Sequence, residues 1–241
     1  MKPVFHEAGS PADAAKSAAE FLLAQANAAV QRRGRAAIAV SGGSTPRLMF
    51  EGLASRGCDW KNVHIFWVDE RCVPPGHSES NYRMTREAFL DPCGFPAEQV
   101  HRIEGELPPQ QAADRYVALI QEFFQLQPDE LPRFDVVHLG MGADAHTASL
   151  FPGESLILDR KHIAASVYSA ARDSHRITLL PGVLLDARSA FFLVTGDDKA
   201  EPLRRLLHEP FDPLARPAQL FANEMPDVRW FLDQAAARGF R

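Results

Sequence analysis

A glycine-rich loop with a single histidine is the segment of this sequence best suited to catalysis. It reads Gly-Met-Gly-Ala-Asp-Ala-His-Thr-Ala-Ser over residues 140–149 and directly follows an apolar run at 136–139 that is typical of a buried strand. A histidine can transfer protons near neutral pH, and a carboxylate two residues earlier can hold its ring and raise its basicity. We therefore predict that His146 is a catalytic acid/base and that Asp144 orients it.

A second segment suits a phosphate group. It lies between a predicted strand at 36–40 and a predicted helix, and it contains Gly42, Gly43, Ser44 and Thr45. The glycines allow the backbone to approach an anion, and the hydroxyls add donors where the helix begins. The segment is neither Gly-x-Gly-x-x-Gly nor a Walker loop, so it does not indicate a nucleotide. The alternative is an ordinary capped turn between a strand and a helix.

Charged residues complete the candidate site. Asp69, Glu70 and Arg71 end a predicted strand at 62–68, where an acid and a guanidinium can orient a polar substrate; the alternative is a solvated salt bridge. Arg176 and Lys199 lie near further apolar strands and are predicted to bind a phosphate together with the glycine loop. We place Asp69 and Arg71 among the catalytic residues and the two other cations among the substrate-binding ones.

The elements that must position these residues alternate between strands and helices. A first helix is expected to begin after Ser10, with Pro11 in its first turn, and to end at Gly34. Further strands are predicted at 163–167 and 191–194, and helices near 82–90, near 112–124, after Asp198 and near 233–237. The proline-rich stretch at 202–217 is expected to be a surface excursion. This alternation predicts βαβ units with a mostly parallel sheet, in which ligands bind at the carboxyl ends of the strands.

Composition limits the class of protein. The chain has 241 residues, 46% of them hydrophobic, which is enough for one α/β domain spanning 1–241. Its net charge of −5 gives no positive electrostatic potential that would attract nucleic acid. Its longest apolar runs are far shorter than a membrane-spanning helix requires. No secretory signal is visible, and the three cysteines lack Cys-x-x-Cys spacing, so we expect a cytoplasmic protein with reduced cysteines. A monomer or small homo-oligomer is expected.

Taken together, these segments resemble the glucosamine-6-phosphate isomerase/6-phosphogluconolactonase family. The resemblance rests on Ser-Gly-Gly-Ser-Thr-Pro at 41–46, Trp-Val-Asp-Glu-Arg at 67–71, Ser-Asn at 80–81, the loop at 140–152, and shorter matches at 176–178, 196–200 and 230–233. These segments keep their order over most of the chain. The resemblance implies a Rossmann-like α/β fold, with a mostly parallel sheet flanked by helices as in glucosamine-6-phosphate deaminases, and no metal or organic cofactor.

The histidine loop is similar to that of the 6-phosphogluconolactonases. The resemblance implies hydrolysis of 6-phospho-D-glucono-1,5-lactone, in the oxidative pentose phosphate pathway, with His146 as the acid/base group; Asp144 also matches. One residue departs from the family pattern, since Ala145 stands where glycine is usual before the histidine. If the backbone there requires a positive φ, alanine costs about 1 kcal/mol.

The chemistry implied for His146 is general acid/base catalysis. The neutral ring would take a proton from the attacking water and return it to the departing ring oxygen. Backbone N–H groups of the glycine turn, or Arg71, would hold the negative oxygen of the intermediate.

Two other functions compete with this hypothesis. A deaminase or isomerase on the same fold would use Asp69 as its base, but no glutamate closely follows His146, and Arg71 replaces the aromatic residue usual in that pattern. A non-catalytic sugar-phosphate sensor would need an output module, and no helix-turn-helix segment is evident.

Overall fold

Short apolar strands form a parallel sheet at the centre of the molecule. The computed structural model describes residues 3–56, 58–225 and 227–240, and in this part of the chain seven strands pair in the order β1-β10-β9-β6-β2-β3-β5. Every pairing in this sheet is parallel. The strands are β1 (Val4–Ala8), β2 (Ala36–Val40), β3 (Val63–Trp67), β5 (Val100–His101), β6 (Val136–Leu139), β9 (Ala190–Val194) and β10 (Arg229–Asp233).

Helices connect the strands and begin at residues suited to that position. The Ser10 hydroxyl accepts a hydrogen bond from the Asp13 N–H at the start of α1, and Gly34 ends that helix with φ 77°, so both predicted boundaries are confirmed. The helices are α1 (Pro11–Arg33), α2 (Ser44–Ala54), α3 (Asn81–Thr85), α4 (Asp91–Cys93), α5 (Pro109–Phe124), α6 (Pro181–Leu185), α7 (Ala200–His208) and α8 (Gln219–Glu224). A π-helical turn, η1 (Arg86–Leu90), joins α3 to α4, and 3₁₀ turns occur at η2 (Ala97–Gln99), η3 (Ser155–Leu158), η4 (Ala170–Arg172), η5 (Asp197–Lys199) and η6 (Ala236–Phe240).

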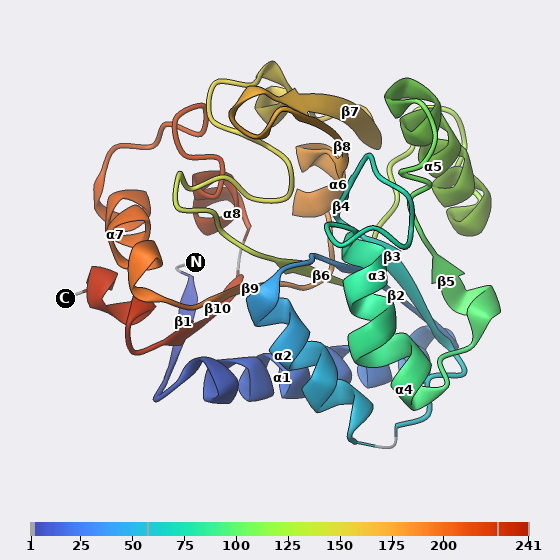
Figure 1. Cartoon of the computed structure of the whole chain (residues 1–241), viewed down its shortest axis with the longest axis horizontal. Helices are drawn as coiled ribbons and strands as arrows, with labels where there is room; N and C mark the ends of the chain where they lie inside the picture. The colour runs from blue at the N-terminus through green and yellow to red at the C-terminus, as the bar shows by residue number, and fades with distance from the viewer. Residues whose placement is uncertain (1–2, 57, 226, 241) are drawn as a thin grey trace.

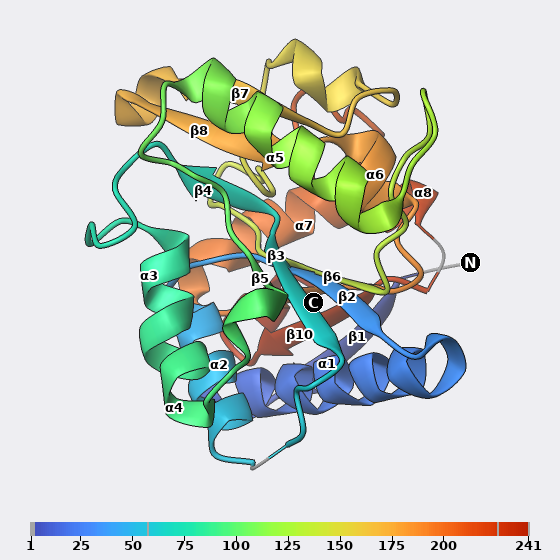
Figure 2. The same cartoon turned by 90° about the vertical axis from the view of Figure 1, so that its right-hand side faces the viewer.

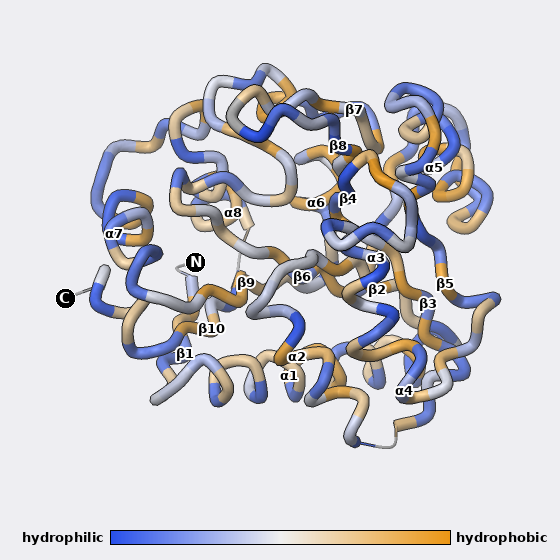
Figure 3. The backbone as a smooth tube through the Cα atoms, in the orientation of Figure 1, coloured by the Kyte–Doolittle hydropathy of each residue, from blue (hydrophilic) through white to orange (hydrophobic). Residues whose placement is uncertain are grey.

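The elements pack in layers on the two faces of the large sheet. Helices α1 and α2 lie on one face, whereas α5, α6 and a small second sheet lie on the other (Figures 1 and 2). Much of strands β2, β3 and β9 has apolar colours in Figure 3, as expected for strands covered on both faces. Helix α1 turns small side chains inward, among them Ala14, Ala18 and Ala26, and can therefore lie close to the sheet.

The second sheet corrects two expectations about strands. The predicted strand at 163–167 does not join the parallel sheet, because β7 (Ala164–Ser169) and β8 (Ser174–Leu179) form a hairpin too short for a parallel crossover. The charged triplet Asp69–Arg71 was expected to end the strand at 62–68, but it forms a strand of its own. This strand, β4, pairs antiparallel with β8, and the chain passes from one sheet to the other at Val68.

Two expectations near the carboxyl terminus were also wrong. The predicted helix near 233–237 is the end of β10 followed by the 3₁₀ turn η6. The surface excursion predicted at 202–217 begins only after His208, because residues 202–208 belong to α7. Pro202 is tolerated there since the first N–H groups of a helix have no partner within the helix.

The strand order creates a crevice between two loops. Strands β2 and β6 are neighbours, but the chain continues from β2 to β3 and β5 on one side and from β6 to β9 and β10 on the other. The loops that follow β2 and β6 therefore diverge, and such a switch point is where open α/β sheets bind their ligands.

Candidate active site

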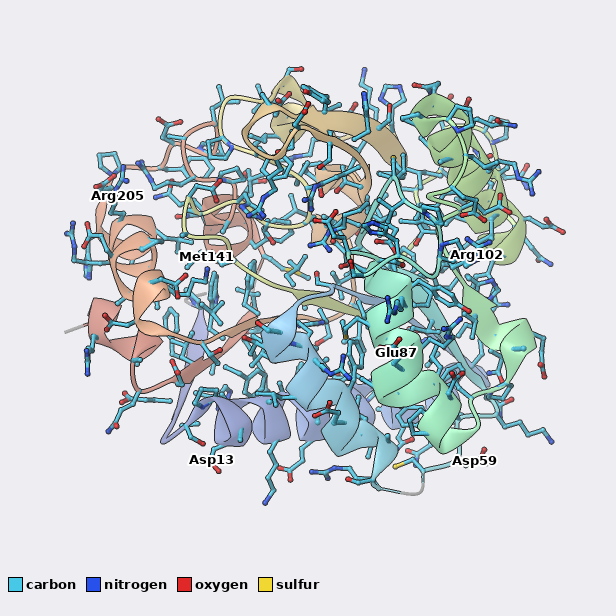
Figure 4. All side chains as sticks on the ribbon, viewed as in Figure 1. Asp13, Asp59, Glu87, Arg102, Met141 and Arg205 are labelled. Atoms are coloured by element: carbon cyan, nitrogen blue, oxygen red, sulfur yellow. The ribbon has the colours of Figure 1, made fainter. Side chains whose placement is uncertain are left out.

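A cavity of about 160 Å³ opens at this switch point. It is lined by Ser41 and Gly42 after β2, Asp69 and Arg71 of β4, Gly140, Met141, Gly142, His146 and Ala148 after β6, and Asn81, Arg172 and Arg176. Met141, labelled in Figure 4, belongs to the loop after β6, whereas the labelled Asp13 and Asp59 lie at the far, α1-covered side of the molecule. The cavity thus brings together four of the segments singled out in the sequence.

His146 and Asp144 form a hydrogen-bonded pair at this cavity. Nδ1 of His146 lies 2.5 Å from Oδ1 of Asp144, and the His146 N–H donates to the same oxygen at 3.1 Å. Burial tends to raise the pKa of the Asp144 carboxyl, but the hydrogen bonds and charge of His146 outweigh it and lower this pKa to about 2. An ionised carboxylate can only accept a hydrogen bond, so the Nδ1 atom that faces it carries a proton. Nε2 is then the ring atom that can accept a proton whenever the ring is neutral.

The loop around His146 is held in a tight conformation. The Gly142 N–H donates to the His146 carbonyl at 2.9 Å, and the Ala145 N–H donates to the Gly142 carbonyl at 3.0 Å. Ala145 has φ 63° and Ala148 has φ 51°, both in the left-handed region. The position of Ala145 therefore does favour glycine, as the departure from the family pattern suggested.

Asp69 ties this loop to the second sheet. Its Oδ2 accepts a hydrogen bond from the Ser149 hydroxyl at 2.7 Å, and the Ser149 N–H donates to Oγ1 of Thr178 at 3.2 Å. The side chain is buried yet lines the cavity. Asp69 thus fixes the C-terminal end of the histidine loop as well as contributing to the cavity wall.

Three arginines surround the cavity without acidic partners. Among the residues that the structure describes, none of Arg71, Arg172 and Arg176 forms an ion pair with a carboxylate. The Arg71 side chain donates to the carbonyl of Glu79, and the Arg176 guanidinium lies over the ring of Phe151 at 5.8 Å. Burial, followed by the positive charge of Arg71, lowers the pKa of Arg176. This positive charge, which the carboxylate of Asp69 offsets only in part, favours an anionic ligand.

The wall formed by the loop after β2 depends on two close contacts. The Ser41 N–H donates to Nδ1 of His138 at 3.3 Å, and the Ser41 hydroxyl donates to the His138 carbonyl at 3.0 Å. A β-carbon on Gly42 would lie 2.0 Å from Oδ1 of Asn81, so only glycine leaves room for that amide. His138 is fully buried within β6 and supports this loop from inside the sheet.

The remaining phosphate-binding candidates lie outside the wall of this cavity. Gly43 caps α2 with φ 125°, Ser44 begins that helix, and Oγ1 of Thr45 lies 2.7 Å from Oγ1 of Thr195 after β9. Nζ of Lys199 lies 2.8 Å from Oδ2 of Asp198. These residues are at the same edge of the sheet as the cavity but, unlike Arg176, are not among the residues that line it.

Two residues of the cavity, Asn81 and Arg172, come from segments outside those proposed for the site from the sequence. Asn81 was noted only as part of the family resemblance, although an Asn directly after the helix-capping Ser80 is a visible signal. Arg172 lies in the short turn between β7 and β8, and its place in the cavity depends on the hairpin. Arg172 was therefore missed because the β7–β8 hairpin was not predicted.

Two features of other kinds of site have no counterpart in residues 3–56, 58–225 and 227–240. No helix there is long and apolar enough to cross a membrane. No group of three or more His, Cys, Asp or Glu side chains is arranged to hold a metal ion in the same part of the chain.

Comparisons with known proteins agree on one family. The model of the family "Glucosamine-6-phosphate isomerases/6-phosphogluconolactonase" matches residues 9–230. A 6-phosphogluconolactonase from Nostoc sp. is 37% identical over 219 residues, covering 90% of both chains, and one from Homo sapiens is 37% identical over 213 residues, covering 86% of this chain and 81% of the relative.

Solved structures show the same fold. The 6-phosphogluconolactonase from Trypanosoma cruzi superimposes with a TM-score of 0.87 at 28% identity, covering 98% of this chain and 96% of the other. A monomeric glucosamine-6-phosphate deaminase has a TM-score of 0.81 at 18% identity, covering 97% and 98%, a likeness of fold alone. From the extent of these matches, the chain belongs to the family of glucosamine-6-phosphate isomerases and 6-phosphogluconolactonases.

Proposed function

We propose that this protein hydrolyses 6-phospho-D-glucono-1,5-lactone to 6-phospho-D-gluconate, in the oxidative pentose phosphate pathway, with His146 as the acid/base group. The observation that carries the proposal is the hydrogen-bonded pair of His146 and Asp144 at the edge of an arginine-lined cavity. The relatives named 6-phosphogluconolactonase support the choice of substrate.

The proposed reaction needs one base and one acid, and the same ring supplies both. Nε2 of His146 takes a proton from water as the water oxygen attacks the lactone carbonyl carbon. When the tetrahedral intermediate collapses, the ring C–O bond breaks and the histidine returns that proton to the departing oxygen. Asp144 holds the required tautomer and stabilises the imidazolium that forms between the two steps.

The negative oxygen of the intermediate needs a donor, for which Arg71 is the better of the two predicted candidates. The Gly142 N–H of the glycine turn already donates to the His146 carbonyl, so this donor is engaged within its own loop. The Arg71 guanidinium lines the cavity, and its contact with the carbonyl of Glu79 fixes its direction. A fixed, half-buried cation at this place stabilises developing negative charge without reorganising during the reaction.

The substrate phosphate is proposed to bind Arg172 and Arg176, the latter lying opposite Arg71 where β4 pairs with β8. Arg176 is only 6% exposed, and both it and Arg172 line the cavity. The loop at 42–45 and Lys199 remain proposed phosphate ligands at the same sheet edge. Remote anchorage of this kind fixes the lactone carbon relative to the attacking water.

A deaminase or isomerase would use Asp69 as its base. In this structure Oδ2 of Asp69 accepts the Ser149 hydroxyl, an arrangement that supports a structural as well as an electrostatic role. The similarity to a deaminase is one of fold at 18% identity, whereas the relatives at 37% identity are named lactonases. These observations favour lactone hydrolysis over ammonia release.

Three assays separate the candidate functions. The lactone is generated in situ, and acid release is followed above its spontaneous hydrolysis. A lactonase accelerates acid release, a deaminase releases ammonia from glucosamine 6-phosphate, and a sensor binds 6-phosphogluconate without turnover. Failure to accelerate lactone opening would contradict the proposal.

The cellular setting is proposed on similar grounds. The three cysteines are free in the structure, which supports the expectation of a reducing, cytoplasmic compartment. A monomer or small homo-oligomer that binds no nucleic acid remains the prediction from the sequence.

A further inference from the structure

Glu70 and Asp69 are neighbours in sequence but lie on opposite faces of β4. Side chains alternate along a strand, and Asp69 and Arg71 both line the cavity whereas Glu70 does not. The Glu70 side chain is nevertheless only 2% exposed. A carboxylate buried so completely must be compensated by hydrogen bonds, since an isolated buried charge is very unfavourable.

Four donors converge on the Glu70 carboxylate. Oε1 accepts from the N–H groups of Arg71 and Asn81, each at 2.8 Å. Oε2 accepts from the Tyr82 N–H at 2.8 Å and from the Ser80 hydroxyl at 3.0 Å. One side chain therefore accepts the free N–H groups at the end of β4 and in the first turn of α3. These bonds hold together the two ends of the loop at 72–79.

These bonds hold two groups that face the cavity. The backbone of Arg71 and the backbone of Asn81 are both bound to Oε1 of Glu70, and both side chains line the cavity. The Asn81 amide also donates to the Asp69 carbonyl at 2.8 Å and occupies the space above Gly42. A shift in the start of α3 would therefore displace Asn81, its contact with Gly42 and the backbone of Arg71 together.

We propose that Glu70 is a positioning residue for lactone hydrolysis, which holds Arg71 and Asn81 in place without touching the substrate. This inference rests on the proposed function. It divides the roles of the acidic pair, because Asp69 belongs to the cavity wall and Glu70 to the support behind it.

The test is Glu70→Gln, which keeps the size of the side chain but leaves one acceptor oxygen and turns an NH₂ group toward N–H donors. Measured at a temperature well below the unfolding midpoint, kcat/KM should fall by about 10- to 100-fold, since small misplacements at a site have effects of this size. Binding of 6-phosphogluconate, followed by calorimetry, should weaken in parallel. Amide exchange at Asn81 and Tyr82 should become faster.

Asp135→Asn provides the matched control. Asp135 is also a buried carboxylate that accepts a backbone N–H, from Ala37 at 2.8 Å, and it lies at the opposite end of the parallel strands. Its variant should lose stability yet keep the kcat/KM of the folded protein. If Glu70→Gln does not fold, Ser80→Ala removes one of the four donors and should give a smaller loss in kcat/KM.

The outcomes separate this inference from the proposed function. A wild-type protein without lactonase activity overturns the function itself. An active wild type together with a folded Glu70→Gln variant of unchanged kcat/KM overturns the positioning role, as does an equal loss in Asp135→Asn. If Ser80→Ala is the variant measured, unchanged kcat/KM has the same meaning.

Discussion

A β-carbon on Gly142 would lie 2.1 Å from Nδ1 of His146 and 2.6 Å from Oδ1 of Asp144. The hydrogen-bonded pair therefore occupies the space that any other residue at position 142 would fill. Gly142→Ala should push the ring away from the carboxylate and lower kcat/KM by about 100-fold, measured on protein shown to be folded by circular dichroism. Gly52→Ala is the control, because its added methyl group meets open space on α2. Comparable activity in both variants would show that the pair tolerates displacement.

Ala145 is both strained and buried. Its φ of 63° disfavours a side chain by about 1 kcal/mol, but its methyl group is only 3% exposed, and burying such a group contributes about 0.8 kcal/mol. Because these effects oppose each other, Ala145→Gly should change the free energy of unfolding by less than about 1 kcal/mol in urea titration. A gain or loss of more than about 2 kcal/mol would contradict this account, because neither effect is that large.

Arg176 and Lys199 are both predicted to bind the phosphate, but their surroundings differ. Arg176→Ala should raise KM at least about tenfold with a smaller change in kcat, because a phosphate contact is the same in the ground and transition states. Lys199→Ala should raise KM less, since this lysine is paired with Asp198 and lies outside the cavity wall. Steady-state kinetics with the phosphorylated lactone measure KM and kcat for both variants. Unphosphorylated gluconolactone, which lacks the group that these cations are predicted to bind, should be a poor substrate for the wild type. A larger effect of Lys199→Ala would place the phosphate at the start of α2 instead.

Much of this site could be predicted because its residues follow buried strands. Each run that became β2, β3 or β6 is short, mostly apolar and followed by polar or glycine residues, so its carboxyl end was evident from the sequence. In a parallel sheet those ends meet, which brings Gly42 and His146 to one place.

The parts that could not be predicted depend on long-range pairing. Nothing local shows that Asp69–Arg71 leaves the main sheet to pair with β8, or that Arg172 is carried to the cavity by the β7–β8 hairpin. The role of Glu70 was equally hidden, because its four donors are identified only once the start of α3 is in place. Local periodicity predicts an element, whereas the partner of that element is set by tertiary packing.

Buried histidines should make the protein sensitive to acid. Burial lowers the pKa of His138 to about 3, and burial together with the charge of His64 lowers the pKa of His101 to about 4. Between pH 6.5 and 4 the unfolded chain binds protons at these rings and the folded chain does not, so stability should be full above pH 6.5 and fall as the pH decreases, by up to about 1.4 kcal/mol per pH unit for each ring.

Urea unfolding at pH 7, 5.5 and 4.5 measures this dependence, which should be shallower in His138→Gln. That variant keeps an acceptor for the Ser41 N–H but removes the titrating group. An unchanged slope would mean that His138 does not contribute to acid sensitivity.

The central claim is that His146 moves the proton during lactone opening, and His146→Asn tests it most directly. Asparagine is polar and of similar size but cannot take and return a proton, so kcat should fall by about 10²- to 10⁴-fold while binding of 6-phosphogluconate changes little. The control is His162→Asn, since His162 also lies against a carboxylate, 2.7 Å from Asp159, but does not line this cavity. With spontaneous hydrolysis subtracted, we expect His162→Asn to retain wild-type turnover and His146→Asn to lose it. A folded His146→Asn variant that hydrolyses the lactone within a few-fold of wild type would contradict the mechanism.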